Sequence, residues 1–347
     1  MANQSLVGAL NVGAYPYAMA MTADSQTLLA TRFISPQNEA QVYRVRTSDF
    51  TKEATIKITA DTTSLDTSTS ARGVVNYLMG IAIEPGTNIA WITGKKDNVF
   101  RGMALDGNFG NFQNAVRSVI AKIDLTTNAE VPNSKFDIDN AEIASAIAFS
   151  RGGEIAYVAN QGNNRLSAYD VSTMQGIDLI NMGLAPKGIT VADNGDVFTH
   201  NFLSRSVSRL TLYTGSGGSL SAFDELSNTV TVSNELLPEV VLKGKRLFYD
   251  TSDTRIAMDG YLACATCHTD GGSDHRVYDF TDRGEGLRNT ISLRGRAGTG
   301  HGRVHWSANF DEIQDFEHDI RFAFLGSGLI DNDDFANANT TLGNPKA

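Results

Sequence analysis

Four stretches of the chain alternate between apolar strands and short polar turns. Each pairs two apolar strands around a turn of Asp, Gly, Pro or Asn; they are AMTADSQTLLAT, AIEPGTNIAWIT, AFSRGGEIAYVAN and TVADNGDVFTHN, beginning at Ala20, Ala82, Ala148 and Thr190. Each is followed by a stretch of alternating apolar and polar residues: QVYRVRTSDF, VIAKIDLTTN, RLSAYDVSTM and VSRLTLYTGS. A period of two is typical of half-buried β-strands. The repeated unit is therefore predicted to be a small antiparallel sheet.

The spacing of these repeats indicates a β-propeller. Counted from their first residues, successive repeats are 62, 66 and 42 residues apart, and the shortest spacing lies in the range of about 40–50 residues per blade. The Thr/Ser-rich segment 51–73 and the Asn/Gly-rich segment 94–116 are predicted to be polar insertions. We expect an all-β propeller over residues 1–235, with a β-sandwich as the alternative.

One repeat carries a resemblance to a known family. VANQGNNRLSAYDVST, which begins at Val158, resembles a blade of the YVTN-type β-propellers, and the other repeats are weaker versions of it. Propellers of that type have six or seven blades. The resemblance therefore implies that further blades precede the chain or have diverged, so that the propeller over 1–235 is incomplete.

The pattern changes from strands to helices after Pro238. Proline suits the first turn of a helix, and the segment PEVVLKGKRLFYD places four residues on one helical face: Val241, Gly244, Leu247 and Phe248. The segment DEIQDFEHDIRFAF repeats this pattern with acidic residues at its start, which favour a helix N-terminus; its apolar face is Ile313, Phe316, Ile320 and Phe324. A second, mainly α-helical domain is predicted over residues 238–347, and the chain is expected to be multidomain.

Composition narrows the choice of partners. The 347 residues are 41% hydrophobic, and 39 acidic against 29 basic side chains give a net charge of −10. Nucleic-acid binding is not expected, because a phosphate backbone requires clustered Lys and Arg. No apolar run approaches the roughly 20 residues of a membrane-spanning helix. An acidic surface can steer a basic protein partner.

The only two cysteines of the chain lie in the sequence YLACATCHTDGG. Cys264 and Cys267 are spaced so that both thiols can reach the vinyl groups of one porphyrin, and His268 follows at once as an iron ligand. This Cys-x-x-Cys-His pattern predicts one covalent haem c. A zinc site is an alternative that needs a fourth ligand from His275, His301 or His305, and no second paired cluster exists. A redox disulfide is the third hypothesis. Such a disulfide usually lies between a strand and a helix of a βαβ unit, whereas this motif follows a predicted helix and precedes a Gly-rich loop.

Downstream residues resemble the di-haem cytochrome c peroxidase and MauG superfamily. In GEGLRNTISLRGRAGTGHGRVHWSANFDEIQDFE, Arg288 and Asn289 match an Arg-Asn-x-Pro segment, with Ile291 in place of Pro. Trp306 matches an aromatic-Trp-Asp-Gly-Arg segment, in which Ser-Ala-Asn replaces Asp-Gly-Arg. The mainly helical domain is therefore expected to be cytochrome c-like, comparable to the first haem domain of that superfamily.

This resemblance also implies roles for individual residues. Cys264 and Cys267 would form the thioethers and His268 the proximal iron bond. Trp306 would relay electrons between two haems, and Arg288 would balance a haem propionate. The family carries a second haem domain, which we expect beyond the end of this chain.

The sixth coordination position of the iron, opposite His268, is expected to be filled by a residue of the same region. His305 is the first choice because it adjoins Trp306, and the remaining candidates are His301, His275 and Met258. If that position is open, the iron can bind peroxide, and Glu312 or Glu317 would move the proton during cleavage of the oxygen–oxygen bond.

These observations lead to one expected function and one alternative. We expect an extracytoplasmic c-type cytochrome that transfers electrons to or from a small electron-transfer protein, within a peroxidase-like haem oxidoreductase. The alternative is a non-catalytic propeller binding protein that carries a mono-haem relay. The N-terminus lacks a basic segment and an apolar segment of a secretory signal. Since haem c is attached outside the cytoplasm, in the periplasm or beyond, we expect an export signal upstream of Met1.

Overall fold

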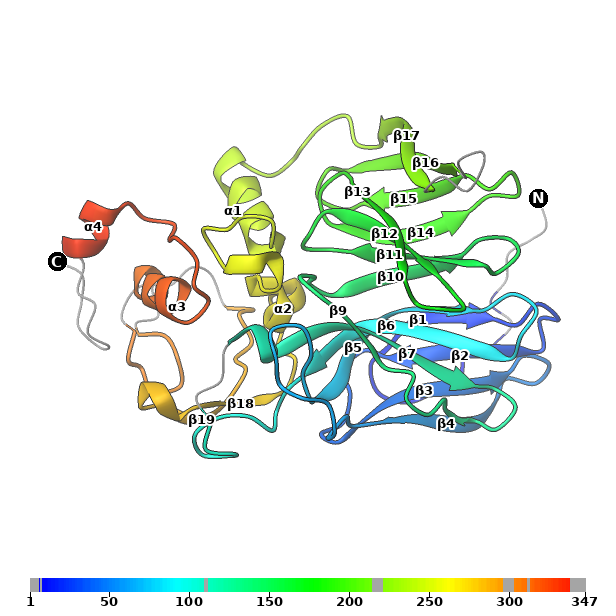
Figure 1. Ribbon diagram of the computed structural model, residues 1–347, viewed down its shortest axis with the longest axis horizontal. Coiled ribbons are helices and arrows are strands. Elements are labelled where there is room, and N and C mark those ends of the chain that lie inside the picture. Colours follow the sequence, from blue (N-terminus) through cyan, green and yellow to red (C-terminus); the bar gives the residue numbers. More distant parts are fainter. Residues whose placement is uncertain are drawn as a thin grey trace.

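The first part of the chain folds into four antiparallel sheets that follow one another along the sequence (Figure 1). The computed structural model describes residues 6, 8–108, 112–213, 221–295, 303–310 and 313–337. Blade 1 contains β1 (Pro16–Met21), β2 (Thr27–Arg32), β3 (Glu39–Arg46) and β4 (Thr51–Thr59). Blade 2 contains β5 (Val74–Ile83), β6 (Ile89–Asp97), β7 (Val116–Asp124), β8 (Ala129–Glu130) and β9 (Phe136–Ile138). Blade 3 contains β10 (Ala144–Phe149), β11 (Ile155–Asn160), β12 (Arg165–Asp170) and β13 (Gly176–Asn181). Blade 4 contains β14 (Pro186–Val191), β15 (Val197–Asn201), β16 (Ser206–Tyr213) and β17 (Ala222–Val230).

These sheets have the architecture of β-propeller blades. Strands of each sheet pair with their neighbours in sequence, and β9 adds to β7 in blade 2. The first strands pack against one another in succession, with β5 between β1 and β10, and β14 beside β10. The propeller expected from the repeats is therefore confirmed as the fold of this region, and the repeats supply the first three strands of every blade.

A residue in the left-handed conformation turns the chain between the first two strands of each blade. Gly86 and Gly195 adopt φ values of 75° and 88°. A Cβ atom at either position would meet no other atom within 4 Å. Glycine therefore suits these positions because it adopts a positive φ easily, and not because a side chain would lack room. Ser25 takes the same role in blade 1 with a φ of 57°.

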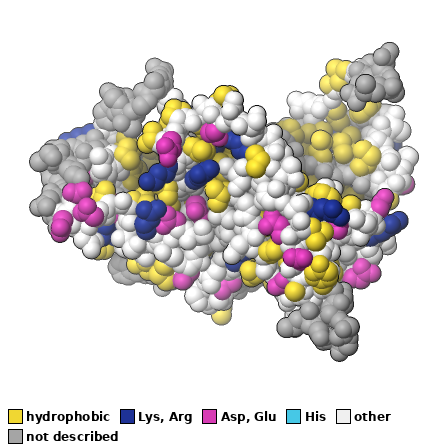
Figure 2. Space-filling model, turned by 90° about the horizontal axis from the view of Figure 1, so that it is seen from above, with side chains coloured by type: hydrophobic (Ala, Val, Ile, Leu, Met, Phe, Trp, Pro, Cys, Tyr) yellow, Lys and Arg dark blue, Asp and Glu magenta, His cyan; other side chains and the backbone are white. Residues whose placement is uncertain are grey.

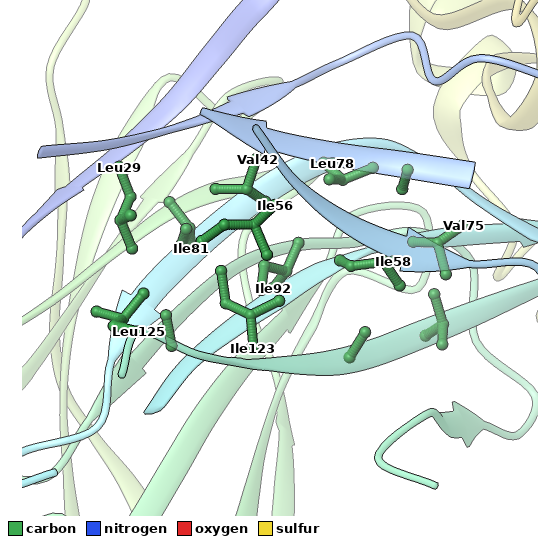
Figure 3. Packing of buried hydrophobic residues seen from close by; sticks show 14 residues of the cluster. Leu29, Val42, Ile56, Ile58, Val75, Leu78, Ile81, Ile92, Ile123 and Leu125 are labelled. Carbon is green, nitrogen blue, oxygen red and sulfur yellow. The ribbon is translucent and has the colours of Figure 1, made fainter. Parts of the chain in front are cut away.

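The largest apolar cluster lies between blades 1 and 2 (Figure 3). Its side chains come from the facing surfaces of the two sheets and point toward one another; among them are Leu29, Val42, Ile56, Ile58, Leu78, Ile92 and Ile123. These seven side chains have no exposed surface. Burial of each contributes about 1.5–3 kcal/mol relative to exposure, so this interface is a main source of propeller stability.

Two segments predicted to be polar insertions are partly strands. β4 occupies the first nine residues of segment 51–73, and β6 continues through Asp97, into segment 94–116. The outer strands β13 and β17 were not predicted because neither contains a fully buried residue: β13 is half-buried and β17 is almost entirely exposed. In β6 the polar residues Lys95, Lys96 and Asp97 are buried, because distant parts of the chain supply their partners.

The expected mainly α-helical, cytochrome c-like domain over residues 238–347 is wrong. Four helices are present in the described part of that region: α1 (Glu239–Tyr249), α2 (Cys264–His268), α3 (Phe316–Phe322) and α4 (Asn332–Asn337). They are 11, 5, 7 and 6 residues long. A two-stranded sheet of β18 (Val277–Phe280) and β19 (Gly286–Asn289) lies between α2 and α3. Short 3-10 turns occur at Phe112–Asn114, Met258–Gly260, Thr269–Gly271, Thr281–Arg283 and Ile313–Asp315.

Apolar packing explains why this region is not an independent helical domain. Tyr249 and Ala265 are buried in a cluster with Ala185 and Leu203 of blade 4. The helix after Pro238 forms as predicted, but a Cβ atom at Gly244 would meet nothing within 4 Å, so no helix crosses closely there. Residues of α1 and α2 therefore form an apolar cluster with loop residues of blade 4 instead of a helix–helix core of their own, and both helices lie beside the blades in Figure 1.

The insertion between β6 and β7 holds the C-terminal region against blade 2. The Ala104 backbone amide donates to Asp279 Oδ2 at 2.6 Å. The Phe112 ring packs at 4.8 Å from that of Phe324 and at 6.4 Å from that of Phe280. The predicted insertion therefore connects blade 2 to the C-terminal region through a hydrogen bond and aromatic contacts.

The surface carries charges of both signs. Lys and Arg side chains are interspersed with Asp and Glu on the face shown in Figure 2. None of the helices in the described ranges is long and apolar enough to cross a membrane.

Candidate functional site

The Cys-x-x-Cys-His turn forms the short helix α2. One helical turn brings Cys264, Cys267 and His268 toward the same side, since residues three and four apart are neighbours on a helix. Both cysteines are free thiols, and Cys264 is exposed. The two intervening side chains, Ala265 and Thr266, point inward and are buried. The turn therefore presents Cys264 at the surface, whereas Cys267 and His268 are half-buried. Burial raises the pKa of the Cys267 thiol.

His268 is held in a defined tautomer. Its Nδ1 lies 3.2 Å from the carbonyl oxygen of Gly272. A carbonyl oxygen only accepts hydrogen bonds, so Nδ1 carries the proton and, in the neutral imidazole, the lone pair lies on Nε2. Burial lowers the pKa of His268, which favours the neutral imidazole that ligates metals. Such a bond to the non-ligating nitrogen is the usual support of a metal-bound histidine.

Glu142 anchors the base of the turn. Its side chain is 1% exposed and belongs to the segment before β10 in blade 3. Thr266 Oγ1 donates to Glu142 Oε1 at 3.2 Å, and the Gly162 amide donates to Oε2 at 3.0 Å. Burial raises the pKa of Glu142 to about 7.

Substitution of Glu142 by Gln should change how stability depends on pH. The folded pKa of about 7 lies above the ordinary value of 4.5, so the folded state binds more protons between these pH values and stability falls as pH rises through this window. The loss approaches about 3 kcal/mol above pH 7, from about 1.4 kcal/mol per pKa unit. We expect Glu142→Gln to gain stability relative to wild type between pH 5 and 8, measured by denaturant unfolding.

The exposed Glu154 of the same blade provides the matched control. Glu154→Gln should leave the pH dependence of wild type unchanged. An unfolding profile of Glu142→Gln parallel to that of wild type over pH 5–8 would contradict an ionisation of Glu142 in this window.

A buried charge cluster joins blade 2 to the segment after the motif. We use this name for Lys95, Asp97, Asp274 and Arg276, whose side chains have no exposed surface. Lys95 Nζ lies 2.7 Å from Asp97 Oδ1 and 2.7 Å from Asp274 Oδ2. Arg276 Nε lies 3.2 Å from Asp97 Oδ2. Two cations and two anions thus neutralise one another across the two regions.

The surroundings of the buried charge cluster keep Lys95 and Asp274 ionised. Burial alone lowers the pKa of Lys95, but the nearby carboxylates of Asp274 and Asp97 outweigh it and leave that pKa raised. Burial conversely raises the pKa of Asp274, and Lys95 brings it below the ordinary range. The Tyr278 hydroxyl donates to Asp274 Oδ2 at 2.9 Å. The cluster therefore fixes the segment that follows His268 at a set position on the propeller.

Arg288 and His305 both lie beside Glu285. Glu285 lies 3.7 Å from Arg288 Nε and 3.3 Å from His305 Nδ1. Trp306 is 62% exposed, and its Nε1 donates to the Asn289 carbonyl oxygen at 2.7 Å. Among the described contacts of these three predicted residues, none reaches Cys264, Cys267 or His268. The sequence did not single out Glu285, although it is the second residue of the segment matched to the superfamily.

The expected ligands of the sixth iron position occupy different surroundings. His305 stacks on Phe310 at 4.3 Å and meets Phe316 edge-on at 4.9 Å. His275 is exposed and contacts the Tyr15 ring at 6.0 Å. Met258 packs in an apolar cluster beside Tyr261. His301 lies outside the described residues, and the sixth ligand stays a prediction.

The carboxylate of Glu317 accepts hydrogen bonds from α3 and from the loop that follows it. Its side chain is 4% exposed, Arg321 Nε donates to Oε1 at 2.7 Å, and the Leu329 amide donates to Oε2 at 3.0 Å. The carboxylate therefore neutralises Arg321 and shapes the loop. Its proposed role as a catalytic acid stays a prediction, and the other candidate, Glu312, lies outside the described residues.

A compact metal cluster is not part of the described site. In the ranges that the structure covers, no group of three or more His, Cys, Asp or Glu side chains is placed to hold a metal ion.

Comparisons with known proteins give structural neighbours but no sequence relatives. No protein-family model matches the chain, and no curated protein sequence matches it. Hydrazine synthase of Kuenenia stuttgartiensis is similar over 65% of this chain, at 16% identity and a TM-score of 0.40. A putative 6-phosphogluconolactonase of Bacteroides uniformis (9% identity, TM-score 0.41) and a periplasmic gluconolactonase of Pseudomonas aeruginosa (9%, 0.43) are similar over 62% and 64% of it. The alignments cover 53%, 57% and 59% of those three structures.

Proposed function

We propose that Cys264, Cys267 and His268 hold one covalent haem c and that the protein transfers electrons outside the cytoplasm. The observation that carries this proposal is the Nδ1 contact of His268 with Gly272, which places the lone pair of the neutral imidazole on Nε2, in the same helical turn as two free thiols. A haem iron, when bound, supplies reversible one-electron chemistry. A zinc site would instead need further ligands converging on the turn.

The protein's own residues position the group. The two thiols form the covalent attachment, and Gly272 orients the imidazole of His268. Glu142 and the buried charge cluster fix the turn to blades 2 and 3, which limits its movement when the charge of the site changes. The propeller thus supports the proposed haem directly, without the helical domain expected from the sequence.

We infer that the protein acts as an electron relay, and the state of Glu317 favours a relay over peroxide turnover. Both Glu317 oxygens accept hydrogen bonds from Arg321 or backbone amides, which supports a structural role for this carboxylate. The resemblance to the di-haem superfamily keeps a peroxidase-like reaction as the second candidate. A small electron-transfer protein is the proposed partner, in the periplasm or outside the cell.

Expression with the cytochrome c maturation machinery tests both parts of the proposal. We expect covalent haem stain on a denaturing gel and a reduced-minus-oxidised spectrum of a c-type haem. Stoichiometric zinc without haem stain would overturn the haem proposal. Rapid turnover of peroxide by the haem-loaded protein would overturn the relay and favour the peroxidase-like candidate.

A further inference from the structure

Three aromatic rings of blades 1 and 2 form a continuous stack that ends at the Cys-x-x-Cys-His turn. Tyr17 and Phe33 stack with centroids 4.8 Å apart and planes at 22°. Phe33 and Tyr77 stack at 4.4 Å with planes at 1°. The Tyr77 hydroxyl donates to the carbonyl oxygen of Cys267 at 2.9 Å. Tyr17 is 46% exposed and Tyr77 is fully buried, so the stack joins the surface to a haem-binding cysteine.

A β-bulge directs Tyr77 into this stack. The register of β5 against β6 shifts between Asn76 and Gly80, and Tyr77 adopts a φ of 46°. This conformation costs a bulky residue about 1–3 kcal/mol and is characteristic of functional positions. A Cβ atom at Gly94 would lie 2.5 Å from the Tyr77 carbonyl oxygen, so glycine is needed opposite the bulge. Bulges re-aim side chains, and this one places the Tyr77 ring between Phe33 and Cys267.

The environment of Tyr77 keeps its hydroxyl protonated. The acceptor of its hydroxyl is a backbone carbonyl, which is too weakly basic to take the proton. Lys95 Nζ lies 4.6 Å from the ring centroid, and a cation in this position disfavours removal of an electron from the ring. Burial raises the pKa of Tyr77 further above its ordinary range. Tyr77 is therefore suited to couple its neighbours electronically while staying neutral itself.

We propose that the stack of Tyr17, Phe33 and Tyr77 is the route by which one electron passes from a one-electron donor at the surface to the haem at Cys264 and Cys267. The donor loses one electron and the haem iron goes from ferric to ferrous; no bond breaks and no proton moves. The route rests on the proposed haem attachment. It adds a defined path and a defined surface position, Tyr17, to that function.

Light-triggered electron injection into the haem-loaded protein tests this route. Met19 lies two residues from Tyr17 on the same face of β1 and is 66% exposed. Met19→Cys can carry a ruthenium polypyridyl photosensitiser, because both native thiols are used by haem. Leu179→Cys in blade 3, 54% exposed, carries the same label as a control off the stack. The measured quantity is the rate of haem reduction after a flash.

Phe33→Leu removes the central ring, and Phe33→Tyr keeps it. We expect Phe33→Leu to slow reduction from the label at position 19 by about tenfold, since the gap it leaves removes contacts on both sides and electronic coupling decays steeply across such gaps. Phe33→Tyr should retain the wild-type rate. Reduction from the label at position 179 should be the same in all variants.

The outcomes separate this route from the proposed function. Equal rates from position 19 in wild type and Phe33→Leu overturn the route, as does equal slowing from both labels. Absence of covalent haem in the wild-type protein overturns the proposed function before any rate is measured. Thermal unfolding and the haem absorption spectrum of Phe33→Leu, compared with those of Phe33→Tyr, show whether the fold is retained.

Discussion

Replacement of both Cys264 and Cys267 by serine is expected to abolish covalent haem. Serine preserves the size and the hydrogen-bonding capacity of the turn but cannot form a thioether. Because Ala265 and Thr266 and not the thiols supply the buried base of α2, the turn should still pack on blade 3. The measurement is haem stain on a denaturing gel, together with the iron content of the purified protein.

Matched single variants show whether the effect belongs to the motif. Cys264→Ser and Cys267→Ser should each leave at most one thioether, and His268→Ala should alter the iron spectrum. His275→Ala, an exposed histidine seven residues away, should retain full haem stain. Wild-type haem stain in the double serine variant would show that haem is attached elsewhere or not covalently.

Replacement of Lys95 by methionine is expected to cause the largest loss of stability in the protein. Methionine keeps much of the volume of lysine but carries no charge. The two carboxylates of the buried charge cluster, Asp97 and Asp274, then share a single cation, Arg276. An unpaired charge in a fully buried site costs about 3–5 kcal/mol when its partner is removed. The free energy of unfolding in denaturant measures this loss.

A surface ion pair provides the control for Lys95→Met. Lys57 is 62% exposed and lies 3.0 Å from Glu39, and Lys57→Met should cost under about 1 kcal/mol. Addition of Asp274→Asn to Lys95→Met should recover part of the loss, because it removes the uncompensated anion. Equal losses for Lys95→Met and Lys57→Met would contradict a stabilising role for the cluster.

Hydrogen exchange can locate the effect of Lys95→Met. The cluster joins blade 2 to the segment that carries Asp274 and Arg276, so amides of residues 264–280 should lose more protection than those of blades 3 and 4. This result would show that the motif is held in place by the propeller. Uniform loss of protection would instead indicate that the cluster supports the whole fold.

The strand repeats were predictable from sequence because their physical cause is local. A strand with one buried face needs apolar residues at every second position, and a tight turn needs Gly, Asn or Asp. The outer strands β13 and β17 were missed for the same reason, since neither buries a continuous face. The Cys-x-x-Cys-His motif was visible because one helical turn brings its three residues together.

In the C-terminal region, helical periodicity led to a wrong prediction of a mainly α-helical domain. The segments 239–249 and 316–322 are helical as expected, but helical periodicity does not reveal what a helix packs against. Tyr249 and Ala265 are buried by residues of blade 4, more than 40 positions away in sequence. Because the C-terminal region buries its apolar residues against blade 4, it does not require a helix–helix core of its own.

The propeller repeats, the two helices and the turn that carries two thiols and one imidazole follow from local sequence patterns, because each depends on residues a few positions apart. How that turn is held depends instead on contacts between distant segments. Glu142 reaches Thr266 across 124 positions, Lys95 reaches Asp274 across 179, and Tyr77 reaches Cys267 across 190. Buried charges and stacked rings depend on partners brought together by folding, and no local pattern encodes them.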